Sequence, residues 1–334
     1  MDRPEPMTTN TESEDRRQTM TDRTILVMGG AHVDRRGRIA GETVPGASNP
    51  GGWFVEAGGG AFNAARNLAR LGHRVRLVSP RGGDAEGEIV AAAAEAAGVE
   101  DTPFIFLDRA TPSYTAIIER DGNLVIALAD MELYRLFSPR RLRQRAMREA
   151  VTAAGMILTD ANLPAETLHA MSAAAKAAGV PIAGIAISPA KVVRFRDSLP
   201  ALAFLFMNEA EARTLAGAAP EDPADWPKAL RAAGLSAGVV TRGGRGVIAF
   251  DGTGAALVVP PEIPALADVT GAGDSLASGF LGAILGGADI AEALRQGVAA
   301  AAITVRSPRA VAEEMSQAAL ARALSLVPQA EILS

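Results

Sequence analysis

The 334-residue sequence contains no cysteine, only three histidines and few aromatic residues, which make up 4% of the chain. The lack of cysteine excludes disulfide bonds, thiolate metal ligands and a cysteine nucleophile. His32, His73 and His169 lie far apart in the sequence, which argues against a zinc site built from histidines. The core must therefore be built from Ala, Val, Leu and Ile.

Long apolar runs and a charge excess of one sign are also missing. The sequence has no run of about 18 apolar residues, as a membrane span needs. It also has no apolar segment after the first methionine, as a secretory signal needs. The 33 Lys and Arg residues against 38 Asp and Glu give a net charge of −5, which argues against sequence-independent binding to nucleic acid. We therefore expect a cytoplasmic protein with neither a nucleic-acid nor a membrane partner.

The chain divides into a polar tail and a long remainder. Residues 1–22 are charged and almost free of aliphatic side chains, so we expect a disordered tail, or an over-long start with Met20 as the true beginning. From residue 23 to residue 334, short apolar runs alternate with Ala-rich segments of helical periodicity. This alternation predicts an α/β domain with a mostly parallel sheet and helices on both faces, a three-layer α/β/α fold.

The elements expected in this domain follow from the same patterns. Strands are predicted over residues 24–29, 74–78, 155–159, 181–187, 203–207, 237–241 and 246–251. Helices are predicted over residues 61–71, 86–97, 139–153, 165–178, 209–216, 226–233, 271–285, 290–305 and around 312–326. Two segments do not follow the alternation: 35–57, rich in Gly, Pro, Ser and Asn, and 102–128, with three short strands. We expect these two segments to pair as a small β-sheet lid.

The segment 268–274, Asp-Val-Thr-Gly-Ala-Gly-Asp, carries the strongest chemical signal. Three residues with little or no side chain stand where a helix is expected to begin: Gly271, Ala272 and Gly273. Free N–H groups at a helix N-terminus bind anions, and the helix dipole adds to the attraction. Asp274 lies beside them, where a carboxylate can accept the proton of a hydroxyl that attacks a phosphoryl group. The alternative is that Thr270 and Asp274 only cap the helix.

Three further segments place small or polar residues where elements meet. The glycines at 58–60 open a helix with Asn63 one turn in, and this is either a polyol-binding loop or a tight turn. Asn208 and Glu211 follow a buried strand, where they either form a capping box or position magnesium and phosphate. Residues 241–246, Thr-Arg-Gly-Gly-Arg-Gly, either close a hairpin or pass beneath nucleotide phosphates.

Together these motifs resemble those of the PfkB (ribokinase-like) carbohydrate kinase family, from about residue 24 to residue 326. The resemblance rests on Gly-Gly-x-x-x-Asn at 58–63 and on the late Asp-Val-Thr-Gly-Ala-Gly-Asp, with Asp34 and Asn208 in the family's order. The sequence has no Walker-type P-loop, and no strand–GxGxxG–helix unit begins a dinucleotide fold. The resemblance implies a ribokinase-like α/β/α fold with a small β-sheet lid, and a homodimer formed through that lid.

The resemblance also implies an activity and its residues. The enzyme would transfer the γ-phosphoryl group of ATP with Mg²⁺, and K⁺ is a further candidate ion. Asp274 would be the general base, and the amides of Gly271, Ala272 and Gly273 would stabilise the phosphoryl group. The residues implied in substrate binding are Asp34, Gly59, Asn63, Asn162 and Asp274. Those implied in nucleotide binding are Asn208, Thr241, Gly243, Gly244, Gly246, Gly273 and Ala301. Glu211 would contact Mg²⁺ through water, and Asp268 and Thr270 would hold K⁺.

Within the family, several segments are similar to those of the pseudouridine kinase subfamily: 48–51, 111–114, 129–131, 159–163, 191–199 and 208–217. The reaction this implies is phosphorylation of the 5′-hydroxyl of pseudouridine. The alternatives are a kinase for ribose, another nucleoside or a keto-sugar acid, and a non-catalytic sugar- or nucleotide-binding regulator. The unbroken Gly-Ala-Gly-Asp argues against the regulator. His32 and the segment 186–188 depart from the family pattern, while Trp53, Phe54 and Tyr114 are either nucleobase contacts or packing residues.

Overall fold

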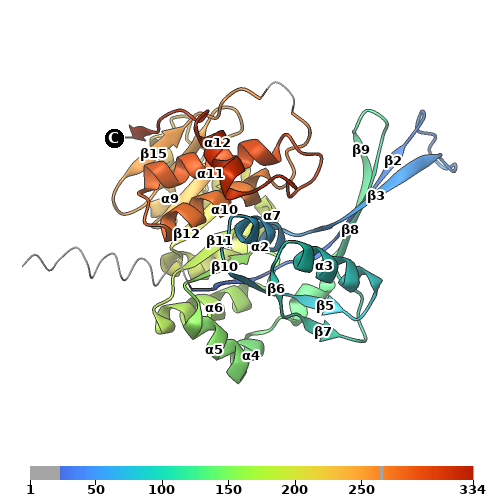
Figure 1. Ribbon diagram of the computed structural model, residues 1–334, viewed down its shortest axis with the longest axis horizontal. Helices are drawn as coiled ribbons and strands as arrows, with labels where there is room; N and C mark the ends of the chain where they lie inside the picture. Colours follow the sequence, from blue (N-terminus) through green and yellow to red (C-terminus); the bar gives the residue numbers. More distant parts are fainter. Residues whose placement is uncertain (1–22, 264–265, 334) are drawn as a thin grey trace, which may run out of the picture.

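A computed structural model describes residues 23–263 and 266–333, so the predicted tail at 1–22 lies outside the described residues. Within these ranges, one ten-stranded sheet forms the centre of the molecule (Figure 1). Its strands run in the order β16 (Glu331–Leu333), β15 (Ala255–Val258), β14 (Val247–Phe250), β13 (Gly238–Thr241), β12 (Phe204–Asn208), β11 (Ile182–Ile185), β10 (Met156–Asp160), β1 (Ile25–Met28), β4 (Val75–Val78) and β6 (Glu100–Asp101). The strands from β6 to β13 are parallel, and β14, β15 and β16 pair antiparallel.

Helices cover both faces of this sheet, because its central strands are short runs of aliphatic residues that are buried on both sides. One face packs against α2 (Gly60–Arg70), α3 (Ala85–Ala96), α10 (Ala272–Leu285), α11 (Ile290–Thr304) and α12 (Gln317–Leu324). The other packs against α4 (Pro139–Leu142), α5 (Arg145–Ala153), α6 (Ala165–Ala178), α7 (Pro189–Val192), α8 (Glu209–Ala216) and α9 (Asp225–Ala232). Each face has its own hydrophobic cluster, and the predicted three-layer fold is confirmed.

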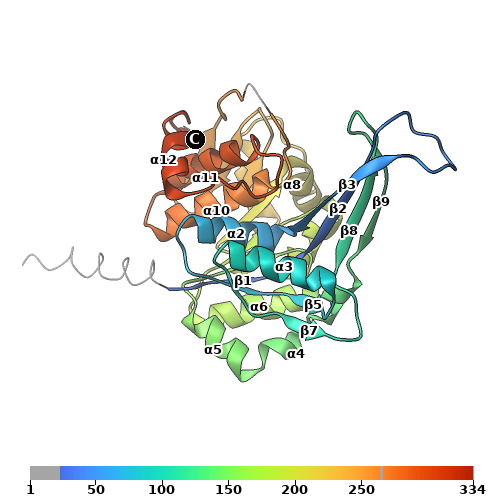
Figure 2. The ribbon, with the colours of Figure 1, turned by 45° about the vertical axis from the view of Figure 1, so that its right-hand side comes forward.

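A second, four-stranded sheet projects from the main body (Figure 2). Its order is β3 (Gly51–Gly58), β2 (His32–Ile39), β8 (Ser113–Ile118) and β9 (Leu124–Asp130). The predicted pairing of the two irregular segments therefore occurs between residues 32–58 and 113–130. We refer to these four strands as the small sheet.

The predicted strand at 102–107 does not belong to the small sheet. The chain there forms β7 (Phe104–Phe106), which pairs with β5 (Pro80–Gly82). The reason is burial of an aromatic ring: Phe104 meets Phe137 edge to face, with ring centres 5.4 Å apart, at the margin of the core. A place on the exposed small sheet would leave this ring in water.

The order of the strands places a crevice at the middle of the main sheet. After β1 the chain builds β4 and β6 on one side and then crosses to β10 on the other. The loops that leave β1 and β10 therefore diverge, and in open α/β sheets ligands bind at such a switch point, beyond the carboxyl ends of the strands.

Candidate active site

A cavity of about 1040 Å³ opens at this end of the sheet, between the small sheet and α11. Residues of the first half that line it are His32, Gly59, Gly60, Tyr114, Ala129, Met131, Asn162, Ile187 and Lys191. Residues of the second half are Asn208, Glu211, Thr241, Gly243, Gly244, Ala272, Gly273, Asp274, Val298, Ala301 and Ala302. The cavity thus brings together residues that the sequence places more than 200 positions apart.

The N-terminus of α10 faces the cavity without a side-chain cap. Gly271 takes the N-cap position with a left-handed φ of 78°, and no side chain bonds to the first helical N–H groups. A Cβ atom at this position would lie 2.1 Å from the carbonyl oxygen of Ala310, so only glycine fits. The alternative that Thr270 caps the helix is wrong, because its hydroxyl and its N–H both donate to Asp268. The N–H of Ala272 donates to the carbonyl of Val269 at 3.2 Å, and the N–H groups that follow it at this end can receive an anion.

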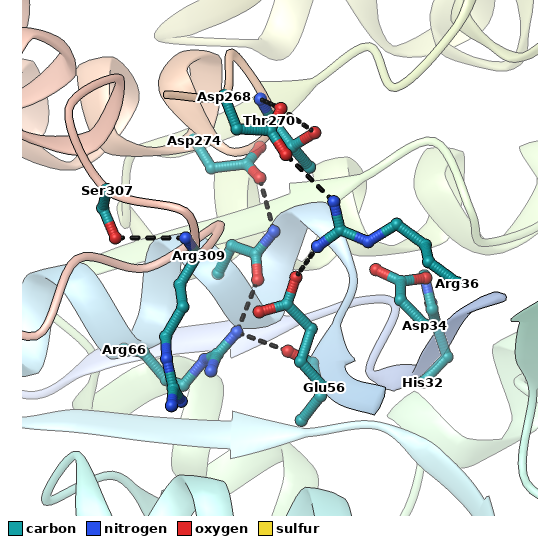
Figure 3. A network of polar contacts seen from close by, with 12 residues as sticks. His32, Asp34, Arg36, Glu56, Arg66, Asp268, Thr270, Asp274, Ser307 and Arg309 are labelled. Atoms are coloured by element: carbon teal, nitrogen blue, oxygen red, sulfur yellow. Dashed lines mark hydrogen bonds and ion pairs between the residues drawn. The ribbon is translucent and has the colours of Figure 1, made fainter. Parts of the chain in front are cut away.

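Asp274 lies in the first turn of α10 and is held by a short relay of hydrogen bonds (Figure 3). The side-chain amide of Asn63, on α2, donates to Asp274 Oδ2 at 2.8 Å. Arg66, one turn further along α2, donates to Asn63 Oδ1 at 2.7 Å and to the carbonyl of Ala57 at 2.7 Å. This contact fixes the orientation of the Asn63 amide, so that its N–H group points to the carboxylate.

The surroundings of Asp274 give it the properties of a proton acceptor near neutral pH. Burial raises the pKa of Asp274 to about 7, against the lowering effect of the Asn63 hydrogen bond. A carboxylate with a pKa in this range is ionised above neutral pH and still basic enough to take a proton. The free amides of α10 are its immediate neighbours. The pair is chemically suited to accept a hydroxyl proton and to stabilise charge on a transferred group.

Asp160, which the sequence analysis did not assign, organises the floor of the crevice. It ends β10 and is fully buried, and its carboxylate accepts the N–H groups of Gly30, at 3.2 Å, and of Ala61, at 3.0 Å. It also accepts the side-chain amide of Asn162 at 2.9 Å, and the oxygen of that amide accepts the ammonium of Lys191 at 2.7 Å. A signal was present, because Asp160 is a charged residue at the end of a short, buried strand.

His32 and Asp34 stand at the base of β2, where the small sheet joins the cavity (Figure 3). The imidazole of His32 is buried, with Nδ1 2.9 Å from the hydroxyl of Tyr134 and Nε2 3.2 Å from Asp34 Oδ1. Asp34 does not itself line the cavity wall. The histidine that departs from the family pattern thus positions the neighbouring carboxylate through a direct contact.

The second half of the cavity contains most of the predicted nucleotide-binding residues, whereas the predicted K⁺ ligands Asp268 and Thr270 do not line it. Asn208 and Glu211 form the capping box, in which each side chain accepts the backbone N–H of the other residue, at 2.9 and 2.7 Å. Burial raises the pKa of Glu211, which also lines the cavity. Gly246 does not line it; with φ of 112° it closes the hairpin between β13 and β14.

The structure divides the candidate nucleobase contacts into two groups. Tyr114 and Met131 line the cavity, whereas Trp53 and Phe54 do not, and the indole of Trp53 is 63% exposed. Ile187 also lines it and has φ of 69°, the one positive value for a residue other than glycine in the described chain. Such a conformation is strained for a β-branched residue and is typical of functional sites.

Neither a protein-only metal site nor a membrane helix is found in the ranges that the structure describes. Residues 23–263 and 266–333 contain no group of three or more His, Asp or Glu placed to hold a metal ion. None of the helices in the same ranges is long and apolar enough to cross a bilayer.

Comparison with known proteins matches residues 25–316 to the pfkB family of carbohydrate kinases. Pseudouridine kinase of Escherichia coli (strain K12) is 29% identical over 314 residues, which are 93% of this chain and 98% of the relative. A carbohydrate kinase from Agrobacterium tumefaciens is 62% identical and superposes with a TM-score of 0.86, over 93% of this chain and 100% of the other. Arabidopsis thaliana ribokinase, complexed with ribose and ATP, shares the fold, with a TM-score of 0.79 at 21% identity over 90% and 98% of the two chains. The chain therefore belongs to the pfkB family of carbohydrate kinases, which are phosphotransferases.

Proposed function

We propose that the enzyme transfers the γ-phosphoryl group of ATP to the 5′-hydroxyl of a nucleoside, with pseudouridine as the first candidate. The observation that carries this proposal is Asp274, a carboxylate with a raised pKa that stands between the two halves of one cavity. One half, under the small sheet, would hold the nucleoside. The other half, between β13 and α11, would hold ATP. A hydroxyl beside Asp274 would then face the γ-phosphoryl group.

In this arrangement the chain's own groups account for proton and charge transfer. Asp274 takes the proton of the 5′-hydroxyl as its oxygen bonds to the γ-phosphorus, and the bond to the leaving ADP oxygen breaks. The N–H of Ala272 donates to the carbonyl of Val269 at 3.2 Å, so the N–H of Gly273, at the open N-terminus of α10, would stabilise the negative charge of the transferred group. Gly273 suits this position, because a Cβ atom there would meet no neighbour within 4 Å and the N-terminus stays open to the ligand.

The residues that line the second half of the cavity support ATP as its ligand. Gly243 and Gly244 allow phosphates to approach the backbone, and Thr241 adds a hydroxyl beside them. Ala301 and Ala302 on α11 leave room for a flat ring such as adenine. Glu211 fits Mg²⁺ held through water, because one carboxylate oxygen caps α8 while the side chain still lines the cavity. Mg²⁺ would neutralise charge on the phosphates.

The substrate half supports a nucleoside in particular. Tyr114 and Ala129 of the small sheet, with Met131 directly after β9, present an apolar surface of the kind that covers a flat ring. Asn162 and Lys191, on the opposite side, offer hydrogen-bonding groups to a polar edge. Asn63 and Asp34 do not line the cavity, but each contacts a residue that does, Asp274 and His32 respectively, and would stand behind the ribosyl hydroxyls. Pseudouridine is preferred among nucleosides because of the relative that matches over 98% of its length.

A panel assay tests the proposal. ADP release is measured with pseudouridine, uridine, adenosine, ribose and 2-keto-3-deoxygluconate, and the product is located by mass spectrometry. We expect the highest kcat/KM with pseudouridine and a product carrying one phosphoryl group at the 5′ position. A higher kcat/KM with another compound would change the assigned substrate and leave the proposed kinase activity standing. No ADP release above background with any compound would contradict the proposal and favour a non-catalytic regulator.

We also propose that two copies pair through the small sheet. Ala129 of β9 lines the cavity, and side chains alternate along a strand, so Ile126 and Leu128 point to the opposite face. These side chains are 65% and 71% exposed, and Trp53 adds to the exposed apolar surface of the small sheet. A contiguous apolar face of this kind on a soluble chain favours an interface.

A further inference from the structure

Arg36 connects the small sheet to the segment 268–271, which leads into α10 and Asp274 (Figure 3). It lies on β2, and its Nη1 atom donates to Asp268 Oδ2 at 2.9 Å. Its Nη2 atom donates to Glu56 of β3 at 2.7 Å, and its guanidinium lies over the ring of Phe54, 4.8 Å from the ring centre. These contacts hold the guanidinium in one place, with about a quarter of the side chain exposed.

Asp268 begins the segment that leads into α10 and Asp274, and three of the four acceptor positions of its carboxylate are in use. Oδ1 accepts the N–H and the hydroxyl of Thr270, at 2.9 and 2.8 Å, and Oδ2 accepts Arg36. Burial alone would raise the pKa of Asp268, but these hydrogen bonds and the charge of Arg36 lower it. The carboxylate is therefore ionised and already paired with a cation.

This arrangement does not fit the K⁺ ion that the family resemblance implies for Asp268 and Thr270. K⁺ binds through oxygen atoms, and a guanidinium 2.9 Å from the same carboxylate oxygen would repel a second positive charge. The hydroxyl of Thr270 is likewise turned to Asp268 as a donor. The guanidinium of Arg36 thus supplies the positive charge at Asp268 where K⁺ would be expected.

We propose that Arg36 is a built-in cation at Asp268, which positions the catalytic loop and makes bound K⁺ unnecessary. The inference rests on the proposed kinase function. Among the described residues, this ion pair is the one side-chain polar contact between the small sheet and the segment 266–333. The placement of the small sheet, which covers the substrate, is therefore coupled to the loop that carries the base. Arg36 acts through Asp268, so it is a positioning residue.

The test compares the wild type with Arg36→Met and Arg36→Lys in KCl and in choline chloride at equal ionic strength. Arg38→Met is the matched control, because Arg38 is exposed on the same strand and makes no ion pair in the described chain. Melting temperature and kcat are both measured. We expect the wild type and Arg38→Met to give the same values in both salts. Arg36→Met should lose about tenfold in kcat in choline, as for a misplaced reactive group.

The response of each variant to KCl relative to choline chloride supports or overturns the proposal. Since Arg36→Met exposes the Asp268 carboxylate, K⁺ should raise its melting temperature and recover part of its kcat, and a second substitution, Asp268→Asn, should remove that response. Arg36→Lys, which keeps the charge, should remain insensitive to K⁺. The proposal is overturned if K⁺ raises the kcat or melting temperature of the wild type, or if Arg36→Met behaves like Arg38→Met. The melting temperatures need no substrate, so failure of the proposed kinase function would be seen separately.

Discussion

At the scale of single residues, burial and the hydrogen-bond relay from Arg66 through Asn63 act in opposite directions on the pKa of Asp274, the proposed base, and burial has the larger effect. The sequence pointed to Asn63 and Asp274 through their motifs, and the structure joins them by a 2.8 Å hydrogen bond. It could not have pointed to Arg66, and for Asp160 the signal was limited to a charged residue at the end of a buried strand. Their roles depend on which backbone groups and side chains meet after folding, and both contact partners that come from other elements.

The raised pKa of Asp274 predicts the pH dependence of the reaction. Below a pH of about 7 the carboxylate is protonated and cannot accept a proton, so kcat/KM should rise as pH increases through about 7 and then level off. Asn63→Leu removes a hydrogen bond that favours the ionised form, and the midpoint should therefore move to higher pH. Profiles of kcat/KM against pH for the two proteins check this. A wild-type midpoint near 4, or a downward shift in Asn63→Leu, would contradict the assignment.

At the scale of elements, prediction worked where local signals were strong. The helix at 165–178 was predicted with its observed limits, because Pro164 precedes it and Gly179, with φ of 67°, ends it. The segment 139–153 was predicted as one helix but forms two. Leu142 and Met147 are both buried, and five residues turn an ideal helix by about 140° away from its starting face, so a break is needed to bury both.

The strands β5, β6, β15 and β16 were not predicted, and the last two illustrate the weak local signals of such strands. β15 is a run of four residues whose place depends on pairing with β14, and β16 is an edge strand with mostly exposed side chains. Both are formed by partners that lie elsewhere in the sequence. Their absence from the prediction reflects the dependence of short strands on context rather than on their own composition.

The start of α10 gives a prediction at this scale. Gly271→Ala places a Cβ atom 2.1 Å from a backbone oxygen and forces a left-handed φ on alanine. The free energy of unfolding should therefore fall by about 1–3 kcal/mol. Gly273→Val is the contrasting variant, because its position is open. It should keep most of its stability and lose kcat by blocking the helix N-terminus. Denaturant unfolding and kinase rates separate the two effects, and a fully active Gly273→Val would count against the anion site.

At the scale of the whole molecule, the order of motifs along the chain indicated the fold, and the crevice at the switch point follows from that fold. What the sequence could not supply is the connection between distant parts. The contact of Arg36 with Asp268 spans 232 positions, and the exposed apolar face of the small sheet appears only when its strands are paired. Such features depend on tertiary structure and have no local sequence signature.

The apolar face predicts an oligomer that one charge can disrupt. Leu128→Glu puts a carboxylate into the proposed interface, where burying an unpaired charge is costly, so the variant should elute as a monomer. Leu326→Glu is the control, because Leu326 is also an exposed leucine, at 59%, but follows α12 and is not part of the small sheet. Light scattering after size exclusion gives the masses. A monomeric wild type, or a dimeric Leu128→Glu, would rule out this interface.

The central claim, that Asp274 is the base for phosphoryl transfer, is tested most directly by the rate of Asp274→Asn. The amide keeps the shape of the side chain but cannot take a proton. We predict that kcat at pH 8 falls by roughly 10²–10⁴-fold, as for the loss of a general base, while the Kd for ATP measured by calorimetry stays nearly unchanged. A variant that phosphorylates its substrate at close to the wild-type rate would contradict the account.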